Sequence, residues 1–171
     1  DPEKFFELEQ SIKGLADTCR ELDCPVVSGN VSLYNETSAG RIYPTPLVVT
    51  AGLIVDRDNM QNSGATKSGD RIYLVGNAEG SLGSSRYQYM KDGKPLGKTV
   101  EPNRQDEKLF RERAIKTAYA HCADSGRVVA GGGLAVALAN EAAASQIGMK
   151  ISAKTESSVE ALLFSEGGAR A

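Results

Sequence analysis

CPVVSGNVSLYNE, at residues 24–36, joins a short apolar run to a polar segment that begins at Gly29. The apolar run, residues 24–28, predicts a short strand. It follows residues 3–22, whose apolar side chains recur at steps of three and four and therefore predict an amphipathic helix. Such a tight connection between a helix and a strand is typical of a layered fold of helices on a sheet.

The polar segment after this strand carries groups that suit a magnesium–phosphate site. Gly29 permits close approach of the backbone to a ligand, and Asn30 and Ser32 offer an amide oxygen and a hydroxyl. Mg²⁺ binds oxygen ligands, usually one or two from protein together with phosphate oxygens. The residues alone leave two interpretations open, a ligand site or a turn stabilised by its own asparagine and serine side chains.

Two further glycine-rich segments are candidate anion sites. Residues 76–85 could cradle an anion with backbone amides, although they lack the Gly-Lys-Ser/Thr of a Walker A loop; the alternative is a plain flexible loop. Gly131, Gly132 and Gly133 precede a predicted helix, whose N-terminus suits an anion; the alternative is tight packing of helix and strand. Glu166 is expected to be a carboxylate at a strand end, and it could either bind a ligand or cap a turn.

The remaining pattern favours an α+β fold, or a loosely alternating α/β fold, with a mixed sheet packed by helices. Further strands are predicted at residues 47–55, 71–75, 128–129 and 149–152. Further helices are predicted at 107–121, 134–144 and 159–163, with a short one around Tyr87 and Met90. A polar stretch at 57–69 predicts a linker between a first domain, 1–56, and a second, 70–171.

Composition excludes several classes of function. Twenty basic and 22 acidic side chains give a net charge of −2, so no attraction to nucleic acid or to an anionic membrane is expected. No apolar run approaches the ~20 residues of a membrane-spanning helix, and the N-terminus has no signal-peptide core. Three cysteines without zinc-type spacing predict buried, reduced thiols in a cytoplasmic protein.

Five segments of the chain resemble the phosphoribosylformylglycinamidine synthase family. The most specific is residues 25–37, PVVSGNVSLYNET, and the others are IYPTP at 42–46, GDRIYLVG at 69–76, GGLAVALA at 132–139 and LFSE at 163–166. They occur in the family's order and cover nearly the whole chain. The resemblance implies an aminoimidazole ribonucleotide synthetase-like fold. It places this chain in the second of the family's two related halves, from the end of an N-terminal domain into a C-terminal domain.

The same resemblance implies a function. The family is an ATP-dependent ligase of purine biosynthesis that converts formylglycinamide ribonucleotide and glutamine-derived ammonia to the amidine, releasing ADP and phosphate. Matching positions imply that Gly29 contacts nucleotide, Asn30 binds Mg²⁺ and Ser32 contacts substrate. The implied partners are a glutaminase subunit, in some organisms a small accessory subunit, and the remaining polypeptide, without which this segment is expected to be inactive.

Two departures and two alternatives accompany this resemblance. About five residues of the family's pattern are missing after Gly131, so either the loop is shorter, which weakens ligand binding, or the sequence omits part of it. The family's motif after Glu166 is altered to Gly167-Gly168. One alternative function is a non-catalytic half that holds a structural nucleotide with Mg²⁺. The other is a different ATP-dependent synthetase of the superfamily, which residues 31–36, VSLYNE, disfavour.

Overall fold

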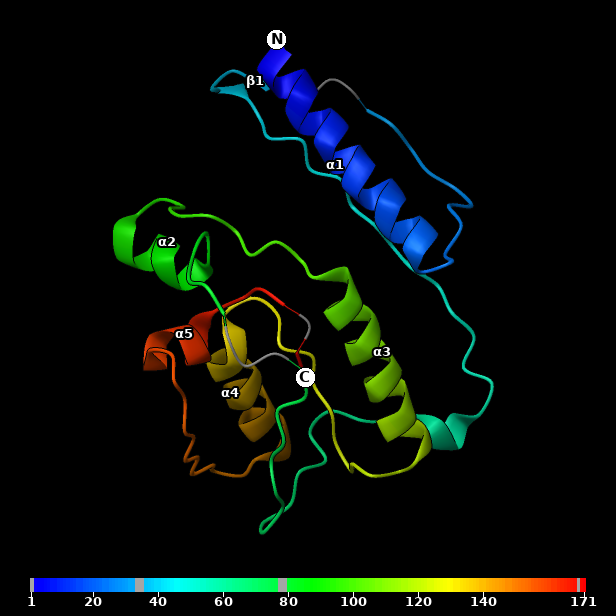
Figure 1. Cartoon of the computed structure of the whole chain (residues 1–171), viewed down its shortest axis with the longest axis vertical. Helices are drawn as coiled ribbons and strands as arrows, with labels where there is room; N and C mark the ends of the chain where they lie inside the picture. Colours follow the sequence, from blue (N-terminus) through cyan, green and yellow to red (C-terminus); the bar gives the residue numbers. More distant parts are fainter. Residues whose placement is uncertain (1, 33–35, 77–79, 169) are drawn as a thin grey trace. The chain divides into compact units, whose positions relative to one another are not determined.

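The computed structural model describes residues 2–32, 36–76, 80–168 and 170–171. The chain divides into two compact units, Asp1–Leu53 and Ile54–Ala171. Figure 1 traces both units. The predicted domain bounds concern the longer enzyme of the family and remain predictions.

The first unit consists of one long helix, a small hairpin and irregular backbone. Helix α1, Pro2–Glu21, confirms the predicted amphipathic helix; the proline suits its first turn. Strands β1, Glu36–Thr37, and β2, Gly40–Arg41, pair antiparallel, with Thr37 opposite Gly40. Gly40 has a φ of +120°, a value that L-residues rarely adopt, so a glycine suits the second strand's start.

The two strands predicted at residues 24–28 and 47–55 are wrong for this structure. Both segments have irregular backbone, and their apolar side chains are exposed, with Val27 at 91% and Leu47 at 90%. A strand is stable only when its N–H and C=O groups pair with a neighbouring strand. Neither segment has such a neighbour among the described residues, so the apolar pattern is present without the sheet.

The described residues of the second unit form four α-helices and a 3-10 turn. They are η1 at Arg57–Asn59, α2 at Arg86–Asp92, α3 at Arg104–Tyr119, α4 at Gly133–Ser145 and α5 at Val159–Phe164. Side chains of Ser85, Asn103 and Ser158 accept hydrogen bonds from first-turn N–H groups of α2, α3 and α5. These caps satisfy donors that have no partner within the helix. The predicted helices are therefore confirmed, with ends shifted by up to three residues.

Packing in the second unit centres on α4 and α5, which contact one another and lie side by side in Figure 1. Leu162 of α5 and Val129, which precedes α4, are buried apolar residues. Tyr87 of α2 stacks on Phe164 of α5, with ring centroids 4.6 Å apart. These contacts connect α2, α4 and α5 into one cluster.

The end of the chain pairs with two of the predicted strand segments. Val75 and Ala171 exchange two backbone hydrogen bonds of 2.8 and 3.0 Å, and Val129 N donates to Arg170 O at 2.9 Å. These are single contacts rather than strands, and residues 71–74 and 149–152 also have irregular backbone. The strands predicted there are wrong, and the sheet of the described residues is the β1–β2 hairpin. The fold is thus mixed, with helices and a small sheet.

Candidate functional site

The predicted nucleotide corner, Gly29, Asn30 and Ser32, lies on exposed irregular backbone in the first unit. A Cβ added to Gly29 meets no atom within 4 Å, so within this chain the glycine is not required by packing. Leu33, Tyr34 and Asn35 of the same motif lie outside the described residues. The roles of the three site residues stay predictions.

The polar groups at this corner, an amide oxygen and a hydroxyl, are chemically suited to bind Mg²⁺ and phosphate. Asn30 is exposed, so its amide oxygen is accessible to a ligand. Among the described residues no group of three His, Cys, Asp or Glu side chains gathers into a metal cluster. A site with one protein oxygen and several phosphate oxygens is a usual arrangement for Mg²⁺, and Asn30 would hold the ion in that way.

The other two glycine-rich segments meet at Glu166 in the second unit. One oxygen, Oε1 of Glu166, accepts 2.9 Å hydrogen bonds from the backbone N–H groups of Gly132 and Arg86. Gly132 immediately precedes α4, and Arg86 is the first residue of α2, directly after the segment 76–85. Asn77, Ala78 and Glu79 of that segment lie outside the described residues. The carboxylate therefore binds one N–H group within residues 131–133 and one directly after residues 76–85.

Glycine is required at two positions of this corner. Gly133 has a φ of +71°, and a Cβ there would lie 2.6 Å from Leu163 O and 2.8 Å from Ser165 O. A Cβ on Gly80 would lie 1.9 Å from Ser165 Oγ. Close approach of the backbones at these two glycines brings the N–H groups of Gly132 and Arg86 to the carboxylate.

Arg170 lies buried beside this corner with only 1% of its surface exposed. Its Nη2 donates to the carbonyl and the hydroxyl of Ser165. Its Nε and Nη1 are buried without a hydrogen-bond partner. Burial lowers the pKa of the Arg170 guanidinium, because the charged form loses hydration.

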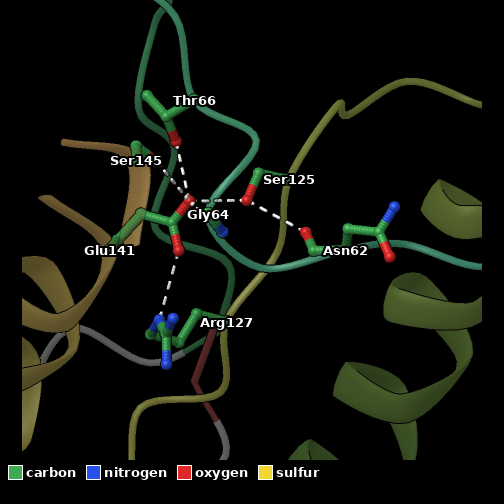
Figure 2. A network of polar contacts seen from close by, with 7 residues as sticks. All are labelled: Asn62, Gly64, Thr66, Ser125, Arg127, Glu141 and Ser145. Carbon is green, nitrogen blue, oxygen red and sulfur yellow. Dashed lines mark hydrogen bonds and ion pairs between the residues drawn. The ribbon is translucent and has the colours of Figure 1, made fainter. Parts of the chain in front are cut away.

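A second polar network, centred on Glu141 of α4, was not predicted. Figure 2 shows its Oε1 facing the donors of three segments: Gly64 N at 2.9 Å, Thr66 Oγ1 at 2.8 Å, Ser125 Oγ at 2.6 Å and, more weakly, Ser145 Oγ at 3.4 Å. Its Oε2 accepts from Arg127 Nε at 3.2 Å. The network holds residues 62–66 and 125–127 against α4 within the second unit.

The charge of Glu141 is stabilised by these donors. Burial opposes ionisation of the carboxyl, but hydrogen bonds from Ser125, Thr66, Gly64 and Arg127 together outweigh it and lower the pKa from 4.5 to about 2. Hydrogen bonds to the ionised form favour that form. With its oxygens already used by protein donors, Glu141 is a structural carboxylate rather than a free base.

Two other sequence predictions concern the thiols and membranes. Cys19, Cys24 and Cys122 are free thiols, but the prediction that they are buried is wrong: Cys19 and Cys24 are half-buried and Cys122 is exposed. Across the described part of the chain, no helix combines the length and the apolar character needed to cross a bilayer.

Comparison with known proteins matches residues 1–54 to the family described as AIR synthase related protein, N-terminal domain. The chain is 36% identical over 169 residues to the phosphoribosylformylglycinamidine synthase subunit PurL of Alkaliphilus metalliredigens, which covers 99% of this chain and 23% of that subunit. It is 36% identical over 165 residues to the same subunit of Leuconostoc mesenteroides, covering 96% of this chain and 22% of the subunit. It is 39% identical over 166 residues to the same subunit of Limosilactobacillus reuteri, covering 97% of this chain and 22% of the subunit.

The chain therefore spans about a fifth of the length of the curated relatives it matches. No solved structure gives a significant match. The family resemblance predicted from the sequence is confirmed: residues 1–54 match the AIR synthase related N-terminal domain family, and nearly the whole chain is similar to one segment of phosphoribosylformylglycinamidine synthase subunit PurL.

Proposed function

We propose that this chain is part of an ATP-dependent carbon–nitrogen ligase of purine biosynthesis. The reaction converts formylglycinamide ribonucleotide, ammonia and ATP to formylglycinamidine ribonucleotide, ADP and phosphate. The observation that carries the proposal is the 36–39% identity with PurL subunits along 96–99% of the chain. Its position in the second of the family's two halves is part of the same proposal.

The proposed chemistry is activation of an amide followed by displacement. The amide oxygen of the substrate attacks the γ-phosphoryl group and ADP leaves; ammonia then attacks the amide carbon and phosphate leaves. Bound Mg²⁺ would neutralise charge on the phosphates. Gly29 would let the backbone approach the nucleotide, the Asn30 amide oxygen would orient the ion, and the Ser32 hydroxyl would bind substrate. Such positioning is the main contribution of protein groups to phosphoryl transfer.

The proposed assembly contains more than this chain. The relatives are named as subunits, which supports a complex of several chains. We propose a glutaminase subunit as the ammonia source, a small accessory subunit in some organisms, and the remainder of the polypeptide. Free thiols support a cytoplasmic location.

A second candidate function is a structural nucleotide–Mg²⁺ site without turnover. The exposed irregular backbone of residues 24–32 favours it, because a bound nucleotide would order such a segment and stabilise the fold by mass action. The two functions make opposite predictions for the same substitutions.

The test uses the Alkaliphilus metalliredigens PurL subunit with this chain in place of its matching segment, assembled with its partner subunits. We expect ADP release that requires both formylglycinamide ribonucleotide and ammonia. Asn30→Asp and Ser32→Ala should each lower kcat by about tenfold or more, because the first places an extra negative charge beside the phosphates and the second removes a contact to substrate. Asn140→Asp and Ser68→Ala, at exposed positions elsewhere, are the matched controls.

Two results would contradict the catalytic proposal. Absence of substrate-dependent ADP release from an assembled, folded chimera would refute the ligase assignment for this chain. Unchanged kcat in Asn30→Asp and Ser32→Ala, together with a lower melting temperature in ADP and Mg²⁺, would establish the structural site instead.

A further inference from the structure

Two half-buried thiols of the first unit lie at the C-terminal end of helix α1. The helix ends at Glu21, with Cys19 in its last turn and Cys24 just beyond it. The backbone N–H of Cys24 donates to the carbonyl of Cys19 at 2.9 Å. Inside this bond, the N–H of Asp23 donates to the carbonyl of Arg20 at 3.3 Å. Such a nested pair of hydrogen bonds is the Schellman motif, which ends many helices.

The backbone conformation of Asp23 completes this motif. Its φ is +50°, in the left-handed region where the Schellman motif places the first residue after the helix cap. Aspartate tolerates this conformation better than most L-residues do. The turn therefore leads the chain back toward the last turn of α1. In this motif the side chains at the positions of Cys19 and Cys24 frequently contact one another.

Side-chain exposure along the chain indicates the same contact. Every residue from 21 to 32 is exposed except Cys24, which is half-buried. Cys19 is half-buried as well, whereas its neighbours Thr18 and Arg20 are exposed. A half-buried side chain in an otherwise exposed segment needs a surface that covers it. The end of α1 that carries Cys19 supplies this surface.

The backbone hydrogen bond between the two cysteines also limits their separation. The nitrogen of Cys24 and the carbonyl oxygen of Cys19 each lie within two covalent bonds of their own Cα atom. A hydrogen bond of 2.9 Å between them therefore keeps the two Cα atoms less than about 7 Å apart. Two cysteines within about that separation can be bridged without movement of the backbone. The helix end thus meets the distance requirement of a disulfide.

We propose that Cys19 and Cys24 form a reversible disulfide, which makes the end of α1 a site of oxidation by low-molecular-weight disulfides. One cysteine thiolate attacks the small disulfide, which gives a mixed disulfide and releases one small thiol. The second thiolate attacks the protein sulfur of the mixed disulfide and releases the other small thiol. The protein thiols lose two electrons and two protons, and the small disulfide gains them.

This oxidation would close a ring across the end of the helix. Both thiols are free in this structure, and the disulfide would fix the link between α1 and residues 24–28. Disulfides of cytosolic proteins are usually transient, catalytic or redox-sensing, so a reversible bridge agrees with thiols that are normally reduced. The inference rests on the first unit alone and is independent of the ligase proposal.

The test treats the full 171-residue chain with oxidised glutathione. The chain carries Cys122→Ser, so that only this pair can react. Trypsin cleaves after Arg20, between the two cysteines, and mass spectrometry without reduction then shows whether a disulfide joins the two peptides. We expect linked peptides from chains that run as monomers on a non-reducing gel. Dithiothreitol should restore both thiols.

The same reaction in concentrated guanidinium chloride is the control for proximity in sequence alone. We expect the ratio of ring to glutathione adduct to be about tenfold higher in the folded chain, because the helix end holds the two residues together. Equal ratios in both solvents, or linkage only between two chains, would overturn the proposal.

A matched pair of variants at Asp23 tests the motif itself. Asp23→Gly favours the left-handed conformation, whereas the β-branched side chain of Asp23→Val opposes it. Both variants keep the backbone N–H and both thiols. We expect a ratio of ring to adduct about tenfold higher in Asp23→Gly than in Asp23→Val. Equal ratios would show that the helix end does not bring the thiols together, and would refute the proposed site.

Discussion

The two units of the chain differ in what holds them together. In Asp1–Leu53, no described residue is buried, and apolar side chains such as Val27 and Leu47 are exposed. In Ile54–Ala171, apolar Leu162 and Val129 are buried, as are the polar residues Glu141, Ser165 and Arg170. Both units contain a long helix, so helix formation does not explain the contrast. The difference lies in contacts between segments that are distant in the sequence.

This contrast follows from how backbone groups find partners. A helix pairs its N–H and C=O groups within itself, whereas a strand needs a second segment at the right distance. The first unit has apolar runs suited to strands but no paired partner for them among its described residues. In the second unit, hydrogen bonds to Glu141 and Glu166 connect segments that are distant in the sequence, as strand pairing would do in a sheet. The following predictions test this difference.

The largest effect is expected from removal of the carboxylate at the centre of the second unit. Glu141→Ala should lower its free energy of unfolding by about 3 kcal/mol, because the donors of Gly64, Thr66, Ser125 and Arg127 lose their acceptor. Chemical denaturation followed by circular dichroism measures the change. Glu112→Ala, on the exposed face of α3, is the control. Equal effects of the two substitutions would show that the network does not stabilise the unit.

The next effect compares glycines of the two units. Gly133→Ala should destabilise the second unit by about 2 kcal/mol, since the new Cβ meets backbone atoms at 2.6 and 2.8 Å and the φ of +71° strains an L-residue. Gly52→Ala in the first unit meets no atom within 4 Å and should be nearly neutral. Denaturation curves of both variants check this, and a neutral Gly133→Ala would contradict the close approach of α4 to residues 163–165.

Acid should weaken the second unit through Glu141. Its pKa is lowered from 4.5 to about 2 on folding, so the unfolded state binds the proton more readily. The stabilisation is therefore complete above pH 4.5 and is lost as the pH falls from there toward 2. Unfolding measured from pH 6 to 2 should show a steeper loss in the unaltered chain than in Glu141→Gln. Parallel curves would mean that the Glu141 charge contributes nothing.

The smallest effect is expected in α1 of the first unit, and it has the opposite sign. Gly14 lies inside this helix, with space for a Cβ. Gly14→Ala should stabilise the helix by about 1 kcal/mol, because alanine loses less backbone entropy. Far-ultraviolet circular dichroism during heating measures the helix content. A loss of helicity would show that Gly14 has a tertiary contact.

The sequence predicted those elements whose hydrogen bonds are local. Residues 3–22 and 107–121 carry a periodic apolar pattern, and both form helices close to the predicted bounds. Residues 47–55 carry an equally clear apolar run but form no strand, because strand formation depends on a partner that the run itself does not encode. The apolar sequence pattern therefore predicts the helices correctly but does not predict the strands correctly.

For the candidate sites, too, local sequence signals were predictable and contacts between distant segments were not. The glycine-rich segments were candidate anion sites, but their convergence on Glu166 depends on packing between helices and was not predictable from either segment. The Glu141 network was missed altogether. Its signal was present: a lone acidic residue in the alanine-rich helix 134–144 usually requires partners when it is buried. The identity of those partners, in residues 62–66 and 125–127, required the structure.

Amide hydrogen exchange of residues 24–32 and 47–53 in the chimeric PurL subunit tests most directly whether these segments lack a pairing partner in the isolated chain. If these segments pair with the remainder of a longer polypeptide, their amides should exchange much more slowly there than in the isolated chain, and ADP with Mg²⁺ should slow residues 29–32 further. Equally fast exchange in both settings, unaffected by nucleotide, would contradict both the missing-partner explanation and the proposed nucleotide corner.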